Sequence, residues 1–487
     1  MPSVLRVWFG TPPRSIISAL VASVLLRARF LFEGLLADEG GALSAARSWA
    51  NGSPLYRDVW VDRPQGVFLL FRGWDALPLT ATSSLRVLAV LLGASAIAAT
   101  AAIVWILAGQ RAAQYTAWFA ALLSASPMLE GFAANGELLA AGFALPGLAV
   151  ATAVGAGRLS MRWMVLAGLL AGAALTIKQS SFDIVLVVGA WQFVMLVSRR
   201  RPLRRVLSES TLFGLGAALL PLACIWHGVT LGWDSYYYAV AGFRVEARSA
   251  VSSPEFGRLL TSLAFTAPVM APALITALRG EHRRPAWLPR TEGGWLVAIW
   301  VAASTAAFVT GGSFWRHYFV ILAFPLAAVA GVAVTRLGQR WVGTIGPTAL
   351  VSVLCAIPLI ANPRLILGDI VDTNAELTAW VRDQPGERSP TFYVYCADAA
   401  LYTEVGVQPP YPYLWEDHVR MARDGQSRLL GYLTGPEAPD VVFRVQEFEQ
   451  CDVSGAITAA IELHYQPTAT IGEAEVWKRR ADAPVTD

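Results

Sequence analysis

Charge is scarce in this chain. Only 15% of its 487 residues are charged and 55% are hydrophobic, whereas a soluble globular protein averages about 25% charged residues. One soluble core of this length cannot bury so much apolar sequence, so lipid is the expected solvent for most of it. The net charge of +3 and the lack of Lys/Arg-rich runs interleaved with aromatic residues exclude a typical nucleic-acid-binding protein.

Nucleotide-binding motifs are also missing. The sequence contains no GxxxxGKS or GxxxxGKT loop and no strand-anchored GxGxxG. These are the usual signatures of a backbone that binds nucleotide phosphates. The sequence therefore gives no support for a nucleotide as a substrate.

Cysteine is rare as well. Cys224 and Cys355 lie in apolar runs, where a small buried thiol is expected, and Cys396 and Cys451 lie in the polar C-terminal region. If that region is outside the cytoplasm, a Cys396–Cys451 disulfide is feasible, and the sequence leaves it open.

Apolar runs of the length of a membrane span follow one another along the first 361 residues. A span needs about 20 such residues. The eleven runs lie near residues 15–35, 83–108, 113–129, 137–155, 163–177, 181–198, 209–231, 258–278, 293–311, 317–335 and 341–361. The sequence therefore predicts a mainly α-helical, polytopic membrane bundle of about eleven transmembrane helices.

Arginine residues concentrate in alternate loops. One set of loops contains Arg6, Arg14, Arg111, Arg158, Arg162, Arg199, Arg200, Arg201, Arg204, Arg205, Arg279, Arg283, Arg284, Arg290, Arg336 and Arg340. The short loops of the other set hold few cations, namely Lys178, Arg244, Arg248 and Arg316. By the positive-inside rule, the arginine-rich loops face the cytoplasm. This predicts a cytoplasmic N-terminus, and an odd number of spans then places residues 362–487 outside.

Two of the predicted outer segments are long, residues 36–82 and 233–257. In the first, Ala42, Ala46 and Trp49 share one helical face, and the second holds consecutive tyrosines beside charged residues. Both patterns are typical of amphipathic helices that lie in the membrane interface.

The C-terminal residues change character. Strand-like runs occur at 391–395, 440–445 and 474–478, with helical stretches near 374–383, before the first run, and near 455–463, between the last two. This alternation predicts a small α/β domain over residues 362–487, outside the cytoplasm, beside a transmembrane domain over residues 1–361.

Polar and ionisable residues gather at the outer ends of the predicted spans. The set comprises Asp38, Glu39, Arg63, Asn135, Glu137, Lys178, Gln179, Arg316 and His317. Ionisable groups at membrane depth are energetically costly, and they commonly mark functional sites. These residues come from separate hairpins, yet in the predicted topology all of them face one compartment.

Glycosyl transfer from a lipid-linked sugar phosphate needs such a set. A carboxylate takes the proton of an acceptor hydroxyl as the oxygen attacks the anomeric carbon. Arg and Lys hold the phosphate and neutralise the charge that grows on it, and Asn, Gln and His orient sugar hydroxyls. The missing nucleotide motifs favour a lipid-phosphate donor over a nucleotide sugar.

Several of these residues also have a structural alternative; Glu137 would serve as a buried structural carboxylate, and His317 with Arg316 as an interfacial pair. Asp38 and Glu39 would serve equally as solvated charges at a helix end. Lys178 would reach the lipid headgroups by extending its side chain along the span. Arg63 would form an ion pair with its neighbour Asp62. The sequence alone leaves these alternatives open.

Several stretches resemble a known family. They read ADEG at 37–40, PLYRDVWVDRPQGVFLLF at 54–71, RHYFVILAFPLAAVAG at 316–331 and YVYCADAALYTEVGVQPPYPYLW at 393–415. In order and sidedness they resemble the GT-C superfamily of polyprenyl-phosphate-sugar-dependent glycosyltransferases, of the glycosyltransferase family 39 type. The resemblance is strongest to bacterial relatives of the protein mannosyltransferases and of the aminoarabinose transferase.

The resemblance implies a GT-C fold in the bacterial plasma membrane. It implies an inverting transfer of mannose or arabinose from a polyprenyl phosphate to a cell-envelope glycan, lipoglycan, glycolipid or protein. Asp38 matches the family's catalytic base, with Glu39 beside it. Arg63 stands where the family usually has Lys before a double proline, and Gln65 replaces the second proline. No cofactor is obligatory, and a divalent cation, Mg²⁺ or Mn²⁺, near Asp38 and Glu39 is left open.

Two other classes of protein stay open. A membrane transporter or lipid flippase needs charged groups through the membrane midplane and motion between two faces, whereas these charges crowd one face. A non-catalytic membrane subunit leaves the clustered acids and bases unexplained. Substitution of Asp38 separates the three classes, because only the enzyme loses turnover while keeping its fold.

Overall fold

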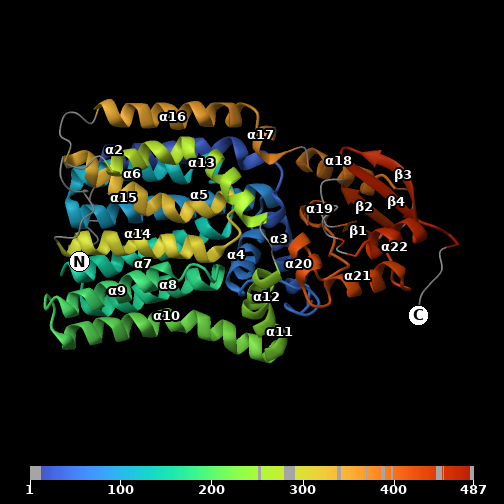
Figure 1. The fold of residues 1–487 in the computed structure, drawn as a ribbon, viewed down its shortest axis with the longest axis horizontal. Coiled ribbons are helices and arrows are strands. Elements are labelled where there is room, and N and C mark those ends of the chain that lie inside the picture. The colour runs from blue at the N-terminus through green and yellow to red at the C-terminus, as the bar shows by residue number, and fades with distance from the viewer. Residues whose placement is uncertain are drawn as a thin grey trace.

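The structure, a computed structural model, describes residues 13–250, 254–278, 291–336, 342–368, 370–384, 390–395, 399–445, 452 and 454–482. Long helices lie side by side at one end of the molecule, and a small sheet with its own helices lies at the other (Figure 1). Cys396 and Cys451 lie outside the described residues, so their bond stays a prediction.

A helix forms in each of the eleven apolar runs. These helices are α2 (Arg14–Ala28), α5 (Ala81–Ala108), α6 (Gln110–Ser124), α7 (Gly136–Gly155), α8 (Met164–Ile177), α9 (Asp183–Val197), α10 (Leu203–Leu231), α13 (Pro254–Leu278), α14 (Glu292–Gly311), α15 (Val320–Arg336) and α16 (Val342–Ala361). Within the described ranges, seven segments are long and apolar enough to cross a membrane, and two shorter apolar helices correspond to α8 and α9. The predicted multi-pass bundle is confirmed, and the number eleven stays a prediction.

Small residues let neighbouring helices of the bundle approach closely. A Cβ atom added to Gly168 of α8 would lie 2.0 Å from the carbonyl oxygen of Phe213 in α10, and one on Gly172 would lie 2.5 Å from that of Ala217. In lipid, where no hydrophobic force drives helices together, such backbone contact supplies much of the packing energy.

The first of the two long segments that were predicted to lie outside forms α3 (Ala37–Ala50) and α4 (Gly66–Asp75). The alanine face of α3 is almost fully buried, with Ala42, Ala45 and Ala46 at most 4% exposed. It packs on α19 (Ala400–Val405) of the C-terminal region, and a Cβ atom on Gly40 would lie 2.3 Å from the Cα atom of Ala400. This face of α3 therefore packs on protein, whereas the sequence predicted that it lies in the membrane interface.

The second long segment that was predicted to lie outside is helical throughout the part described. It comprises α11 (Trp233–Tyr237), a π-helical turn η4 (Tyr238–Gly242) and α12 (Phe243–Ala250). Short 3₁₀ helices enter the bundle from other loops, namely η1 (Arg29–Phe32), η2 (Pro127–Leu129), η3 (Met161–Trp163) and η5 (Arg316–Phe319). Of the predicted site residues, Arg316 and His317 lie in η5.

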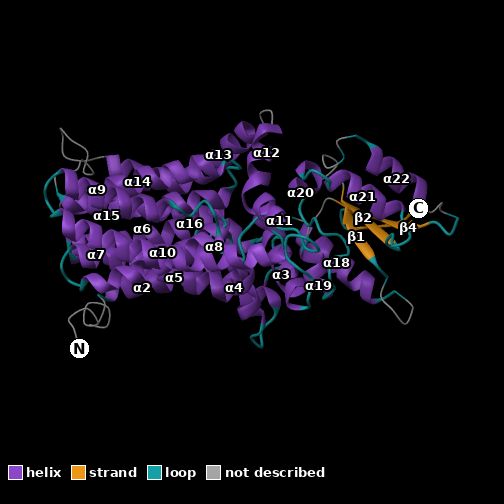
Figure 2. Cartoon of the chain, turned by 90° about the horizontal axis from the view of Figure 1, so that it is seen from below, coloured by secondary structure: helices purple, strands orange, loops and turns teal. Residues whose placement is uncertain are grey.

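The C-terminal region contains a four-stranded sheet in the order β1-β2-β4-β3, confined to one end of the molecule (Figure 2). Its elements are α17 (Arg364–Leu367), α18 (Ile370–Arg382), β1 (Phe392–Tyr395), α19, α20 (Glu416–Met421), α21 (Gly425–Thr434), β2 (Val441–Val445), α22 (Ala456–His464), β3 (Tyr465–Ile471) and β4 (Ala474–Arg479). Strand β1 pairs with β2 in parallel, and the other pairs are antiparallel. β3 is the strand that the sequence pattern misses, because it is an edge strand with mostly exposed residues and a proline.

Candidate active site

The start of α3 fixes the two acidic residues. Asp38 and Glu39 lie in its first turn, where the helix dipole favours negative charge. Glu39 is 1% exposed. One carboxylate oxygen accepts from Ala134 N–H at 2.7 Å, and the other accepts from Leu36 N–H at 3.1 Å and lies 2.9 Å from Arg86 Nη2. Both oxygens of Glu39 are therefore engaged inside the protein.

Asp38, in contrast, is open to a ligand. Its side chain is 41% exposed, and Oδ2 lies 3.7 Å from Nη2 of Arg63. The sequence predicted catalytic roles for both acids, but the buried, engaged carboxylate of Glu39 does not fit such a role. Glu39 instead joins α3 to α5 and to the loop before α7, and so holds Asp38 in place.

The side chains of Arg63 and Lys178 both lie beside Gly136, the first residue of α7. A Cβ atom on Gly136 would lie 3.3 Å from Arg63 Nη1 and 3.1 Å from Lys178 Cδ, so a glycine leaves the room for both cations. Burial disfavours the charge on Arg63, but the carboxylates of Asp38 and Asp62 outweigh it and raise the pKa of Arg63 above its usual value. The guanidinium therefore stays charged.

Asp62 is buried between Arg244 and His418, neither of which was a predicted site residue. Its carboxylate forms an ion pair with Arg244 of α12, and Oδ1 lies 3.4 Å from Nε2 of His418 in α20. Burial favours the neutral acid, but Arg244 outweighs it and holds the pKa of Asp62 well below its usual range. The Gln179 amide donates to the Asp62 carbonyl at 2.7 Å, so this predicted sugar ligand holds the Asp62 backbone instead.

A second chain of charges runs beside α7. Glu137 forms an ion pair with Lys178, and Glu137 Oε2 lies 3.9 Å from Nε2 of His317. On the other side of its ring, His317 Nδ1 lies 2.7 Å from Glu130, whose second oxygen lies 2.9 Å from Arg316 Nη2. The structure thus connects four predicted site residues, with Glu130 joining His317 to Arg316. Glu130 itself was not a predicted site residue.

The Asn135 side chain forms hydrogen bonds with two backbone groups. Its Oδ1 accepts from Leu138 N–H at 2.9 Å as the N-cap of α7, and its Nδ2 donates to the Glu130 carbonyl at 3.1 Å. Both ends of the amide are therefore used within the protein. The sequence predicted a sugar-binding role for Asn135, but its geometry is that of a helix cap.

Gln65, the departure from the family pattern, also has a structural explanation. It is 2% exposed, and its amide nitrogen donates to the Cys224 carbonyl at 2.9 Å and lies 3.1 Å from Nδ1 of His227. Both partners lie in α10. Gln65 therefore ties the segment that carries Arg63 to the bundle.

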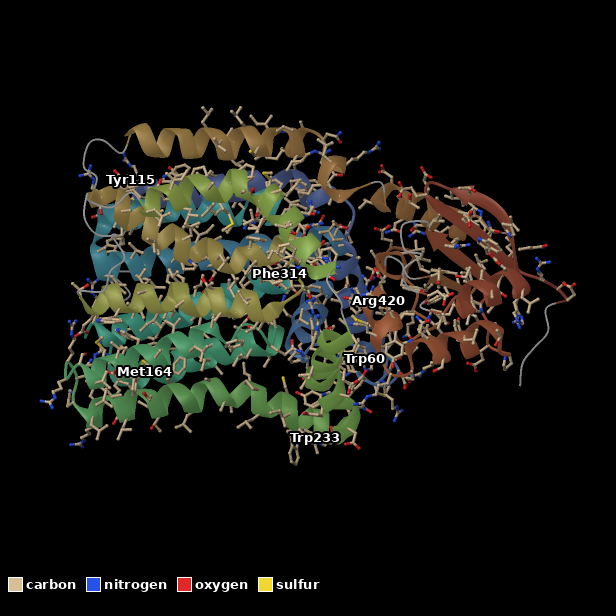
Figure 3. All side chains as sticks on the ribbon, in the orientation of Figure 1. Trp60, Tyr115, Met164, Trp233, Phe314 and Arg420 are labelled. Carbon is tan, nitrogen blue, oxygen red and sulfur yellow. The ribbon has the colours of Figure 1, made fainter. Side chains whose placement is uncertain are left out.

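The site lies where the bundle meets the C-terminal region. Trp60 N–H donates to the Pro412 carbonyl at 3.0 Å, and Trp60 and Arg420 lie at this junction (Figure 3). Thr403 Oγ1 also donates to the carbonyl of Gly40, two residues after Asp38, at 2.7 Å. The C-terminal region is therefore fixed to both segments that carry Asp38 and Arg63.

The described residues do not assemble a metal site. In the part of the chain that the structure covers, no three His, Cys, Asp or Glu side chains group in a way that could hold an ion. The neighbour of Asp38 is an arginine, and the carboxylate of Glu39 is engaged elsewhere. These protein groups alone do not fit the Mg²⁺ or Mn²⁺ that the sequence left open.

Comparisons with known proteins identify the fold. No protein-family model and no curated protein matches the sequence. Among solved structures, ArnT from Cupriavidus metallidurans bound to undecaprenyl phosphate matches 97% of this chain and 99% of its own, with a TM-score of 0.66 and 17% identity. The apo state of that protein matches with the same TM-score and 15% identity.

A second group of matches is archaeal. The Archaeoglobus fulgidus oligosaccharyltransferase AglB, in complex with an inhibitory peptide and a dolichol-phosphate, matches with a TM-score of 0.52 and 12% identity. The match covers 97% of this chain and 74% of AglB. The similarity to both groups spans nearly the whole sequence, so this chain has the GT-C fold that its motifs predicted.

Proposed function

We propose that this protein is an inverting membrane glycosyltransferase that transfers a sugar from a polyprenyl phosphate to a cell-envelope acceptor. The observation that carries the proposal is the half-exposed carboxylate of Asp38, 3.7 Å from Arg63, with Lys178 beside that arginine. A base next to cations is the arrangement that transfer from a sugar phosphate requires. The similar structures add support, since ArnT binds undecaprenyl phosphate and AglB binds a dolichol-phosphate.

In the proposed reaction, the acceptor hydroxyl oxygen attacks the anomeric carbon from the face opposite the phosphate. Asp38 takes the hydroxyl proton as the new carbon–oxygen bond forms. The bond between the anomeric carbon and the phosphate oxygen breaks, and its electron pair leaves with the polyprenyl phosphate. One displacement without a covalent intermediate inverts the configuration of the sugar.

The cations receive the phosphate. Arg63 offers a planar fork that donates two parallel hydrogen bonds, and Lys178 adds a point charge. Each is paired with a carboxylate in the structure, Arg63 with Asp38 and Lys178 with Glu137. Phosphate binding therefore exchanges one partner for another and spares the cations a separate loss of water. It also loosens the hold of Arg63 on Asp38, which leaves the carboxylate available as the base.

We further propose mannose or arabinose as the sugar and a glycan, lipoglycan, glycolipid or protein of the cell envelope as the acceptor, on the basis of the sequence resemblance. The proposed orientation, with the N-terminus in the cytoplasm and residues 362–487 outside, rests on the distribution of arginine. In a variant without native cysteines, a cysteine at Ser427 should react with a membrane-impermeant maleimide on intact cells. A cysteine at Arg158 should react only after lysis, and the reverse pattern would invert the topology.

The proposed function is tested with purified protein in lipid and a panel of polyprenyl-phosphate sugars. Release of free polyprenyl phosphate is followed with and without an envelope extract as acceptor, and the anomeric configuration of the product is read by NMR. We expect turnover of one donor with inversion. Movement of lipid between leaflets without release of lipid phosphate would favour the flippase alternative.

A further inference from the structure

We propose that His418, in the C-terminal region, is a positioning residue for the phosphate-binding arginine Arg63, an inference that rests on the proposed function. The His418 ring contacts the carboxylate of Asp62, with Nε2 3.4 Å from Oδ1. Asp62 directly precedes Arg63, whose guanidinium lies 3.7 Å from Asp38. A residue more than 350 positions away in the sequence thus contacts the chain neighbour of the proposed phosphate-binding arginine.

The surroundings of His418 fix its ring. The side chain is 4% exposed and lies among the rings of Trp60, Phe243 and Trp415, with centroids 4.6, 5.4 and 5.0 Å away. Within the described part of the chain, Nδ1 has no hydrogen-bond partner. The contact with Asp62 is therefore the polar contact that gives this buried imidazole its orientation.

The contact matters because the Asp62 carboxylate lies near more than one cation. Arg244 pairs with one of its oxygens, His418 faces the other, and Arg63 is the next residue in the chain. With both oxygens engaged, Asp62 leaves the Arg63 guanidinium directed at Asp38 and at an incoming phosphate. Without His418, one oxygen of Asp62 is left to compete with the phosphate for Arg63.

The backbone around Asp62 ties this arrangement to the C-terminal region. Trp60, two residues earlier, forms a parallel bridge with Tyr413 and donates to the Pro412 carbonyl. α20, which carries His418, begins at Glu416, a few residues further along the chain. The same short stretch therefore fixes the backbone before Asp62 and supplies the side chain that faces its carboxylate.

The test compares His418→Leu with a matched control, His464→Leu. His464 lies in the same region, is also 4% exposed and also has an Nδ1 atom without a hydrogen-bond partner. Binding of undecaprenyl phosphate alone is measured by titration, together with kcat and donor KM. For His418→Leu we expect binding about tenfold weaker, the effect of one charge-assisted hydrogen bond. The control should leave binding unchanged.

Two further variants separate positioning from mere folding. His418→Gln presents an amide nitrogen near the position of Nε2, so it should restore most of the lost affinity. In an Asp62→Asn background, His418→Leu should add little further loss, because the two residues act through one contact. A structural role alone predicts equal losses for the leucine and glutamine variants and additive effects with Asp62→Asn.

The outcomes distinguish this inference from the proposed function. Wild-type protein that binds the lipid phosphate but turns over no sugar donor would contradict the proposed function. The affinities of His418→Leu and His464→Leu for undecaprenyl phosphate would still decide the positioning role. Sugar turnover with equal affinities for His418→Leu and His464→Leu would overturn the positioning role alone. No binding of the lipid phosphate by folded wild type would overturn both.

Discussion

The buried pair of Glu39 and Arg86 offers a sharp test of the account of the site. Both side chains are 1% exposed, and their atoms lie 2.9 Å apart. Glu39→Gln would remove the negative charge and leave the guanidinium buried without it. Breaking a buried pair from one side typically costs about 3–5 kcal/mol. We therefore expect a loss of this order in the free energy of unfolding.

A second substitution should partly restore the stability that Glu39→Gln loses. Replacing both members, Glu39→Gln with Arg86→Leu, removes the unpaired charge as well, so the double variant should be more stable than Glu39→Gln alone. Glu33→Gln is the matched control, because its partner Arg29 is 48% exposed. A surface pair contributes below about 1 kcal/mol.

Unfolding is followed by far-UV circular dichroism in mixed detergent micelles with increasing SDS. Binding of undecaprenyl phosphate is measured in parallel, because Glu39 also holds the first turn of α3 that carries Asp38. If Glu39→Gln were as stable as Glu33→Gln, or if the double variant were less stable than both single variants, the assignment of Glu39 to a structural role would be refuted.

Three further predictions follow from the geometry. Lys178→Met should raise the donor KM about tenfold, because one charge-assisted contact to phosphate is lost, and an unchanged KM would remove Lys178 from the site. Asn135→Ala should lower stability by about 1 kcal/mol through loss of the α7 N-cap and leave the donor KM unchanged; a large rise in KM would restore its predicted role in sugar binding. Arg244 depresses the pKa of Asp62, so the charged carboxylate stabilises the folded state. The loss of stability in Asp62→Asn should therefore be largest above the unfolded pKa of about 4 and should become smaller as the pH falls below it. Urea unfolding at pH 7 and pH 3 checks this, and an equal loss at both values would contradict it.

Much of the fold was predictable because lipid imposes strong constraints on sequence. Long apolar runs and the arginine distribution predicted the bundle, and each run contains a helix. The α/β pattern predicted β1, β2 and β4 within about a residue at each end. The alanine face of α3 was misread because a small apolar face looks the same whether it packs on lipid or on another part of the chain.

The site was only partly predictable. Asp38 and Arg63 were predicted because they are ionisable and lie in stretches with family resemblance, and Lys178 because it is ionisable and lies at the end of a predicted span. Arg244 was detectable as one of the few cations of the short loops predicted to lie outside. His418 carries no local signal, since its role depends on a contact with a residue far away in the sequence. The sequence could not show which of Asp38 and Glu39 is exposed. Adjacent residues of a helix point in different directions, and which direction is buried depends on contacts with parts of the chain far away in the sequence.

The role of Asp38 as the base is tested by single-turnover release of polyprenyl phosphate by wild type, Asp38→Asn and Asp38→Glu. Each protein is loaded with the donor that wild type turns over and mixed with acceptor, and its affinity for undecaprenyl phosphate is measured separately. We expect Asp38→Asn to lose release while it keeps its affinity for the lipid phosphate, and Asp38→Glu to keep part of the rate. Release by Asp38→Asn at the wild-type rate would contradict the assignment of Asp38 as the base.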